Sequence, residues 1–162
     1  MKKIDKKKLV SHIVSQLERD LEALRAAALE TYAAATNEES KPENKYDTRA
    51  LEASYLAGAQ AKRVLDIEAS LTIYKFLELK EFTHNSMVES TALVEIDLEG
   101  RRSVVFIVPA RGSLTVKFET HTIQVITPVS PLGEALVGLK AGDTATVEKP
   151  DEVLEYEIIS VF

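Results

Sequence analysis

Apolar residues recur at helical spacing along the first part of the chain. From about Ile4 to Ala35 there is no Gly or Pro. Within this run, small and apolar residues are separated by alternating gaps of four and three positions, which is the pattern of a coiled-coil seam. The seam consists of Val10, Val14, Leu17, Leu21, Leu24, Ala28, Thr31 and Ala35. We therefore predict one long helix here.

A second run with helical spacing extends from Glu43 to about Leu79 and is interrupted only by Gly58. Its apolar positions are Ala57, Ala61, Val64, Ile67, Leu71 and Tyr74. Each helix would be roughly 45 to 55 Å long at 1.5 Å per residue. Two such helices bury their apolar stripes most simply against each other. Residues 1–79 are therefore predicted to form an antiparallel coiled-coil hairpin.

The pattern changes after Phe82 to short β-rich runs separated by Gly, Pro and Asp. The predicted strands are 91–98, 103–108, 114–118, 122–126, 145–147 and 154–161. One short helix is expected at Leu132–Leu139, because Ser130 suits an N-cap and Pro131 suits the first helical position. Helices followed by a small antiparallel sheet give an α+β fold, with a second domain over 80–162.

Composition narrows the class of protein. The chain has 162 residues and a formal net charge of −6, which argues against broad adhesion to nucleic acid or anionic membrane. The absence of cysteine excludes disulfides, thiolate metal sites and thiol nucleophiles. No apolar run approaches the roughly 20 residues of a membrane span, and no signal peptide is apparent. We expect a cytoplasmic protein that does not contact membranes.

The segment between the two helical runs is the most chemically distinctive part of the sequence. Residues 37–47, here called the tip segment, place four carboxylates around Pro42. At the turn of a hairpin, these carboxylates can reach another molecule but cannot build a pocket alone. This predicts an accessory factor that acts on a partner rather than an enzyme. Ser40 and Glu43 also fit a capping box, so helix capping is the alternative role of Glu43.

The C-terminal part resembles the bacterial Gre family of transcription elongation factors. The resemblance rests on Ser130-Pro131-Leu132-Gly133-Glu134-Ala135-Leu136-Val137-Gly138, followed by Lys140-Ala141-Gly142-Asp143 and Tyr156-Glu157-Ile158. The family's other half is a coiled coil with an acidic tip, so the resemblance covers essentially the whole chain. It implies that the second domain is similar to FK506-binding protein and docks on RNA polymerase, with Ser130, Pro131 and Leu132 in the contact.

The resemblance also implies a function. The hairpin of such a factor enters the secondary channel of the polymerase, where tip carboxylates help to hold a second catalytic Mg²⁺. This stimulates cleavage of backtracked RNA at its 3′ end by the active site of the polymerase itself. Carboxylate oxygens suit Mg²⁺, and two metals suit phosphodiester hydrolysis. We expect a monomer that binds no cofactor tightly and shares Mg²⁺ with the polymerase.

The tip departs from the family motif D-x-x-E-N-x-x-Y. Glu43-Asn44 is preceded by Ser40 where the first acid would stand. An alternative register uses Glu43 and Asp47, which lie at positions i and i+4 of one helical face, with Glu39 as a reserve ligand.

Three cations flank these acids, namely Lys41, Lys45 and Arg49. They either contact RNA or polymerase near the tip or simply solvate the helix.

Two further functions stay open at this point. The altered tip allows a channel-binding regulator of the polymerase that does not stimulate cleavage. A coiled-coil interaction module with another partner is the third possibility.

Overall fold

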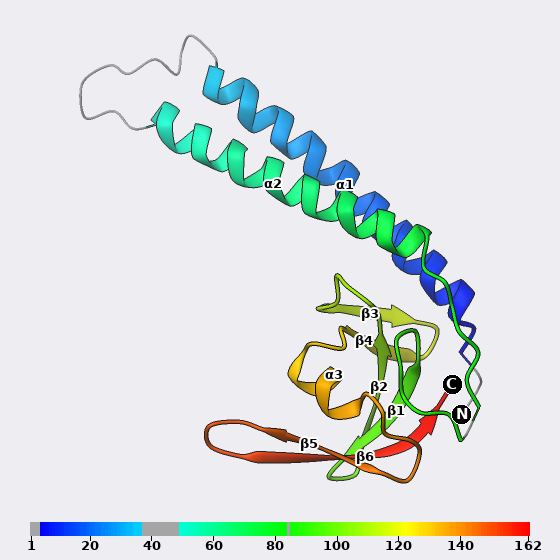
Figure 1. Ribbon diagram of the computed structural model, residues 1–162. Helices are drawn as coiled ribbons and strands as arrows, with labels where there is room; N and C mark the ends of the chain where they lie inside the picture. Colours follow the sequence, from blue (N-terminus) through cyan, green and yellow to red (C-terminus); the bar gives the residue numbers. More distant parts are fainter. Residues whose placement is uncertain (1–3, 37–48, 84) are drawn as a thin grey trace. The chain divides into compact units, whose positions relative to one another are not determined.

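The computed structural model describes residues 4–36, 49–83 and 85–162 (Figure 1). The chain divides into two compact units. One is Ser11–Lys75, the hairpin unit. The other, the sheet unit, joins the residues up to Val10 with Phe76–Phe162. The grouping of the first residues with the sheet differs from the predicted division between 79 and 80, and nothing in the periodicity of the first helix indicated it.

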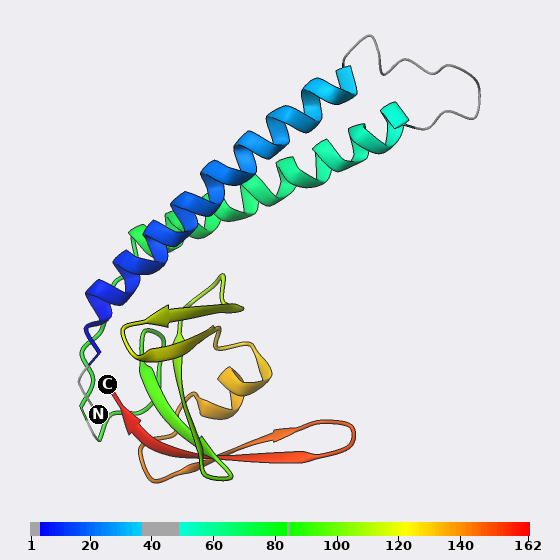
Figure 2. The same ribbon diagram turned by 180° about the vertical axis from the view of Figure 1, so that it is seen from behind.

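The hairpin unit is formed by two long helices that lie side by side and run in opposite directions, α1 (Lys6–Thr36) and α2 (Arg49–Lys75) (Figures 1 and 2). Ion pairs join them between Arg25 and Glu68 at 2.5 Å and between Lys75 and Glu18 at 2.7 Å. Exposed pairs of this kind contribute little stability. The predicted helical hairpin is confirmed. Within the described residues, neither helix is long and apolar enough to cross a membrane.

The core of the hairpin unit lies toward the start of α1 and the end of α2. Ile13, Leu17, Leu21, Leu71 and Tyr74 are buried there. Ile13 takes the buried position that the predicted seam gave to Val14, which is only half-buried. The buried residues of α1 thus follow four-residue steps, so this face is not a strict heptad seam.

The sheet unit contains six strands in the order β3-β4-β2-β1-β6-β5. The strands are β1 (Leu93–Leu98), β2 (Arg101–Ile107), β3 (Leu114–Phe118), β4 (His121–Ile126), β5 (Thr144–Glu148) and β6 (Val153–Val161). Every adjacent pair is antiparallel except β2 and β4, which are parallel. The sheet is therefore mixed and not purely antiparallel as predicted. After β2 the chain crosses to the edge of the sheet and forms β3. It then turns back and forms β4 between β3 and β2, and β4 therefore runs parallel to β2.

The short helix α3 (Pro131–Leu136) packs against β5 and supplies Leu136 to the core. The other buried members of that core are Val88, Ala92, Val94, Ile96, Val105, Ile107, Ile126, Ala145, Ile158 and Val161. The helix was predicted to continue to Leu139 but ends at Leu136. Val137 is the C-cap, and Gly138 follows with a φ of +86°, which glycine adopts without steric cost.

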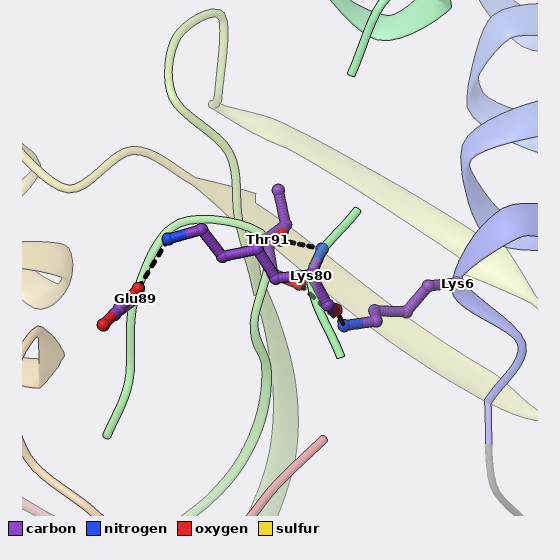
Figure 3. Close-up of polar contacts among 4 residues, drawn as sticks. All are labelled: Lys6, Lys80, Glu89 and Thr91. Atoms are coloured by element: carbon purple, nitrogen blue, oxygen red, sulfur yellow. Dashed lines mark hydrogen bonds and ion pairs between the residues drawn. The ribbon is translucent and has the colours of Figure 1, made fainter. Parts of the chain in front are cut away.

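A lysine joins three segments of the sheet unit (Figure 3). The Lys6 ammonium donates to the carbonyl oxygens of Lys80 and Thr91, the latter at 3.2 Å, and lies 4.4 Å from the centre of the Phe82 ring. Lys80 in turn donates its backbone N–H to Thr91 Oγ1 at 3.0 Å and its ammonium to Glu89 at 2.6 Å. We call this group the Lys6 clasp. It holds the start of α1 to the segments at 80–82 and 89–91.

Candidate functional site

Most of the predicted tip site lies outside the described residues. Glu39, Lys41, Glu43, Lys45 and Asp47 all fall within 37–48. Arg49 is the first residue of α2. Their roles stay predictions. The described residues contain no group of three or more His, Asp or Glu side chains placed to hold a metal ion.

The second predicted site is the turn into α3, and its geometry centres on one carbonyl oxygen. Thr127 O accepts hydrogen bonds from the backbone N–H of Ser130 at 3.0 Å and from Ser130 Oγ at 2.8 Å. The same hydroxyl accepts from the backbone N–H of Gly133 at 3.2 Å. Ser130 is therefore the N-cap of α3 and Pro131 begins the helix, as predicted.

Gly133 permits this close arrangement. A Cβ atom at this position would lie 1.9 Å from Thr127 O and 2.9 Å from Ser130 Oγ. Both distances are shorter than van der Waals contact allows, so a side chain would force the turn open. Gly133 is itself buried, so a side chain at this position would not have open space to enter. The turn into α3 therefore requires glycine at position 133.

The side chains of the turn divide into those that hold it and those that face outward. The Ser130 hydroxyl is used within the turn, and Leu132 is half-buried against the core. Pro131 is exposed, and Val129 is 79% exposed. Among the three residues predicted to contact a partner, Pro131 is therefore the exposed one, while Ser130 and Leu132 are engaged within the turn and the core.

Two further apolar residues lie near the other end of α3, and sequence reasoning missed them. Met87 is 60% exposed and Val137 is 41% exposed. The neighbour of Met87, Val88, accepts from Gly138 N at 2.9 Å and donates to Leu139 O at 2.7 Å, which fixes this segment beside the end of α3. Met87 follows a polar stretch that carries no binding signal. Val137 was expected inside a longer helix.

We call Met87, Val129, Pro131 and Val137 the α3 surface. These residues lie in two pairs, one at each end of α3, and exposed apolar side chains on a hydrogen-bonded backbone are one feature of sites that bind other proteins. The turn into α3 fixes two of these residues, and the bonds to Val88 fix the other two. This arrangement can bind a partner but contains no catalytic group.

Comparison with known proteins identifies the family. Residues 84–162 match the family model described as "Transcription elongation factor, GreA/GreB, C-term". The chain belongs to the GreA/GreB family. The matched segment contains the whole α3 surface, so the site just described lies in the part of the chain that defines this GreA/GreB match.

Curated relatives agree with this assignment. Transcription elongation factor GreA of Neisseria meningitidis is 26% identical over 151 residues, which is 90% of either chain. GreA of Orientia tsutsugamushi strain Boryong is 29% identical over 101 residues, 62% of this chain. The aligned part spans only 60% of that relative's length.

Solved structures are similar over most of the chain. The GreA factor homolog Gfh1 of Thermus thermophilus is 20% identical, with 92% of this chain and 94% of that chain covered and a TM-score of 0.38. GreA/GreB from Nitrosomonas europaea is 25% identical, with 60% and 78% covered and a TM-score of 0.38.

Proposed function

We propose that this GreA/GreB-family protein binds RNA polymerase through its α3 surface and acts as an accessory elongation factor, not as an enzyme by itself. The observation that carries the proposal is the hydrogen-bonded turn at Ser130–Gly133, which leaves Val129 and Pro131 exposed within the family-matched segment. A preformed surface binds without first having to be ordered, which favours affinity.

The hairpin provides the second part of the proposed function. The docked sheet unit would deliver the tip segment to the secondary channel of the polymerase and to the RNA 3′ end. There Glu43 and Asp47, with Glu39 in reserve, would offer carboxylate oxygens to a Mg²⁺ ion shared with the polymerase. Such an ion stabilises charge on the oxygens of a phosphodiester during hydrolysis. Lys41, Lys45 and Arg49 would contact phosphate groups near the tip.

One sequence observation favours a second candidate, a factor that binds the channel without stimulating cleavage. Ser40 stands where the resemblance places the first acid of the tip motif. A hydroxyl is a weaker ligand for Mg²⁺ than a carboxylate because it carries no charge. The two candidates share polymerase binding and differ only in the effect on backtracked RNA.

Binding is tested by measuring the affinity of purified RNA polymerase for the full chain and for the Val129→Asp variant. A buried aspartate at the contact would lose its hydration, so we expect affinity to fall roughly 10- to 100-fold. Val153→Asp is the matched control, since Val153 is also a well-exposed valine of the sheet unit (61%) and lies outside the α3 surface. Equal affinity of both variants would contradict the proposed docking surface.

Cleavage is tested with polymerase stalled on backtracked RNA, by counting the 3′ fragment released with and without the protein. The first candidate predicts stimulation that Glu43→Ala with Asp47→Ala abolishes while polymerase affinity stays unchanged. Unchanged cleavage by the double variant would transfer the role to Glu39. If the wild-type chain binds polymerase and releases no fragment, the second candidate holds.

A further inference from the structure

The outer half of the hairpin unit lacks a buried core. Among the described side chains of 24–36 and 51–70, none is fully buried, whereas Leu17, Leu21 and Leu71 are buried closer to the start of α1 and the end of α2. Several half-buried positions in this half carry alanine, namely Ala27, Ala28 and Ala57, whose side chains fill little of the space between two helices. Large apolar side chains in this half point to solvent instead.

These residues border an open groove of about 830 Å³ between α1 and α2. Leu29, Tyr32 and Leu65 are its large members, and they are 70%, 63% and 64% exposed. The remaining lining consists of small residues, one valine and an ion pair, namely Ala28, Ser54, Ala57, Gly58, Ala61, Val64, Arg25 and Glu68. No atom lies within 4 Å of the place a Cβ would take at Gly58. The groove is thus lined both by large exposed side chains and by small residues that leave space between the helices.

A second hairpin of the same kind is complementary to this groove. In a two-fold pair the same residues lie on both sides, so the leucines and tyrosine of each copy can enter the space above the small residues of the other. Two helical hairpins packed face to face form a four-helix bundle, which is a common way to bury such stripes.

The charges agree with pairing between copies. Arg25 and Glu68 form an ion pair at the groove and cancel each other in charge. A copy placed opposite contributes the same two charges, so neither copy brings an excess of one sign to the pair. An occupant of a single charge sign, such as nucleic acid, finds no net charge of opposite sign in this lining.

The surface area that two copies would bury at the groove indicates how strongly they would associate. Three large side chains, each about two-thirds exposed, and their small neighbours offer on the order of 400–500 Å² per copy. A pair would bury roughly 900 Å² in total, which is within the range of weak, reversible complexes.

We propose that two copies of the protein associate reversibly through the groove lined by Leu29, Tyr32, Gly58 and Leu65, in place of the monomer expected from the sequence. The proposal does not depend on polymerase binding. The proposed dimer goes beyond the proposed polymerase binding. A second copy on the groove would double the thickness of the hairpin, so dimer formation would compete with insertion of the hairpin into a narrow channel.

Sedimentation velocity of the full chain, from about 1 µM to about 500 µM, tests the proposal. We expect the sedimentation coefficient to rise with concentration toward that of a dimer. Leu65→Glu should weaken the association at least roughly tenfold, because two carboxylates would be buried in the pair. Leu56→Glu is the control: Leu56 is a comparably exposed leucine of α2 (54%) that does not line the groove, and its substitution should change nothing.

Gly58→Leu provides a second variant that introduces no charge. A Cβ at this position meets no atom within 4 Å and leucine favours helix, so helix content by circular dichroism should be retained while the larger side chain at the groove weakens the dimer. A wild-type chain that stays monomeric throughout would overturn the proposal, as would equal effects of Leu56→Glu and Leu65→Glu. If the chain is monomeric and Leu65→Glu weakens polymerase affinity instead, the groove belongs to the polymerase contact.

Discussion

At the scale of single residues, two glycines illustrate opposite constraints. Gly133 is enclosed by the Thr127 carbonyl and the Ser130 hydroxyl, whereas Gly58 has open space around it. We expect Gly133→Ala to lower the free energy of unfolding of the sheet unit by about 2–3 kcal/mol through steric overlap. Gly58→Ala, in contrast, should stabilise α2 by up to about 1 kcal/mol, since alanine favours helix. Urea denaturation followed by circular dichroism measures the unfolding free energy of both variants. Equal effects of the two substitutions would contradict the steric constraint at Gly133.

Tyr74 gives the hairpin unit a defined response to alkaline pH. Burial raises the pKa of its hydroxyl from 10.0 to about 12. The folded state therefore keeps the proton more tightly than the unfolded state does. The resulting stability is fully present below pH 10 and is lost as pH rises from about 10 to about 12, by at most about 3 kcal/mol. Tyr74→Phe should remove this part of the pH dependence, as measured by denaturation at pH 9 to about 12.

At the scale of elements, the sequence predicted most of what periodicity can encode. The first helix, all six strands and the start of α3 at Ser130 and Pro131 are present within a few residues of their predicted bounds. The second helix is present but ends at Lys75 instead of about Leu79, and its predicted start at Glu43 lies outside the described residues. The parallel pairing of β2 with β4 could not be predicted, because strand order depends on contacts between distant segments. Met87 and Val137 were missed for the same reason: only backbone bonds across 50 residues of sequence place them on one surface.

The Lys6 clasp is an element-scale contact that the sequence also concealed, because Lys6 is one of five lysines among the first eight residues and nothing in the sequence distinguishes it from the others. Two carbonyl oxygens and the Phe82 ring surround its ammonium. Lys6→Met should lower the unfolding free energy of the sheet unit by about 1–3 kcal/mol, because hydrogen bonds to a charged group are lost. Lys7→Met, at an exposed neighbouring position, should have no measurable effect in the same urea titration.

At the scale of the whole molecule, stability should be unevenly distributed. The sheet unit and the inner hairpin contain the buried residues, while the described side chains of the outer hairpin are at most half-buried. Local opening requires little energy where few apolar contacts are broken. Amide hydrogen exchange at low protein concentration should therefore be fastest in the outer helices and slowest in β1 and β2. Strong protection of 51–65 under those conditions would contradict this expectation.

The strand order also sets a sequence of events in time. β6 lies inside the sheet between β1 and β5, and its Ile158 and Val161 share a core with Leu136 of α3. Pairing Val94 with Val161 requires a long loop to close, and pairing of such distant segments is slow. We therefore expect the α3 surface to be complete only once β6 has joined. A chain caught before that step would carry its helices but lack the surface that we propose for docking, so immature molecules would not compete with finished ones for the partner.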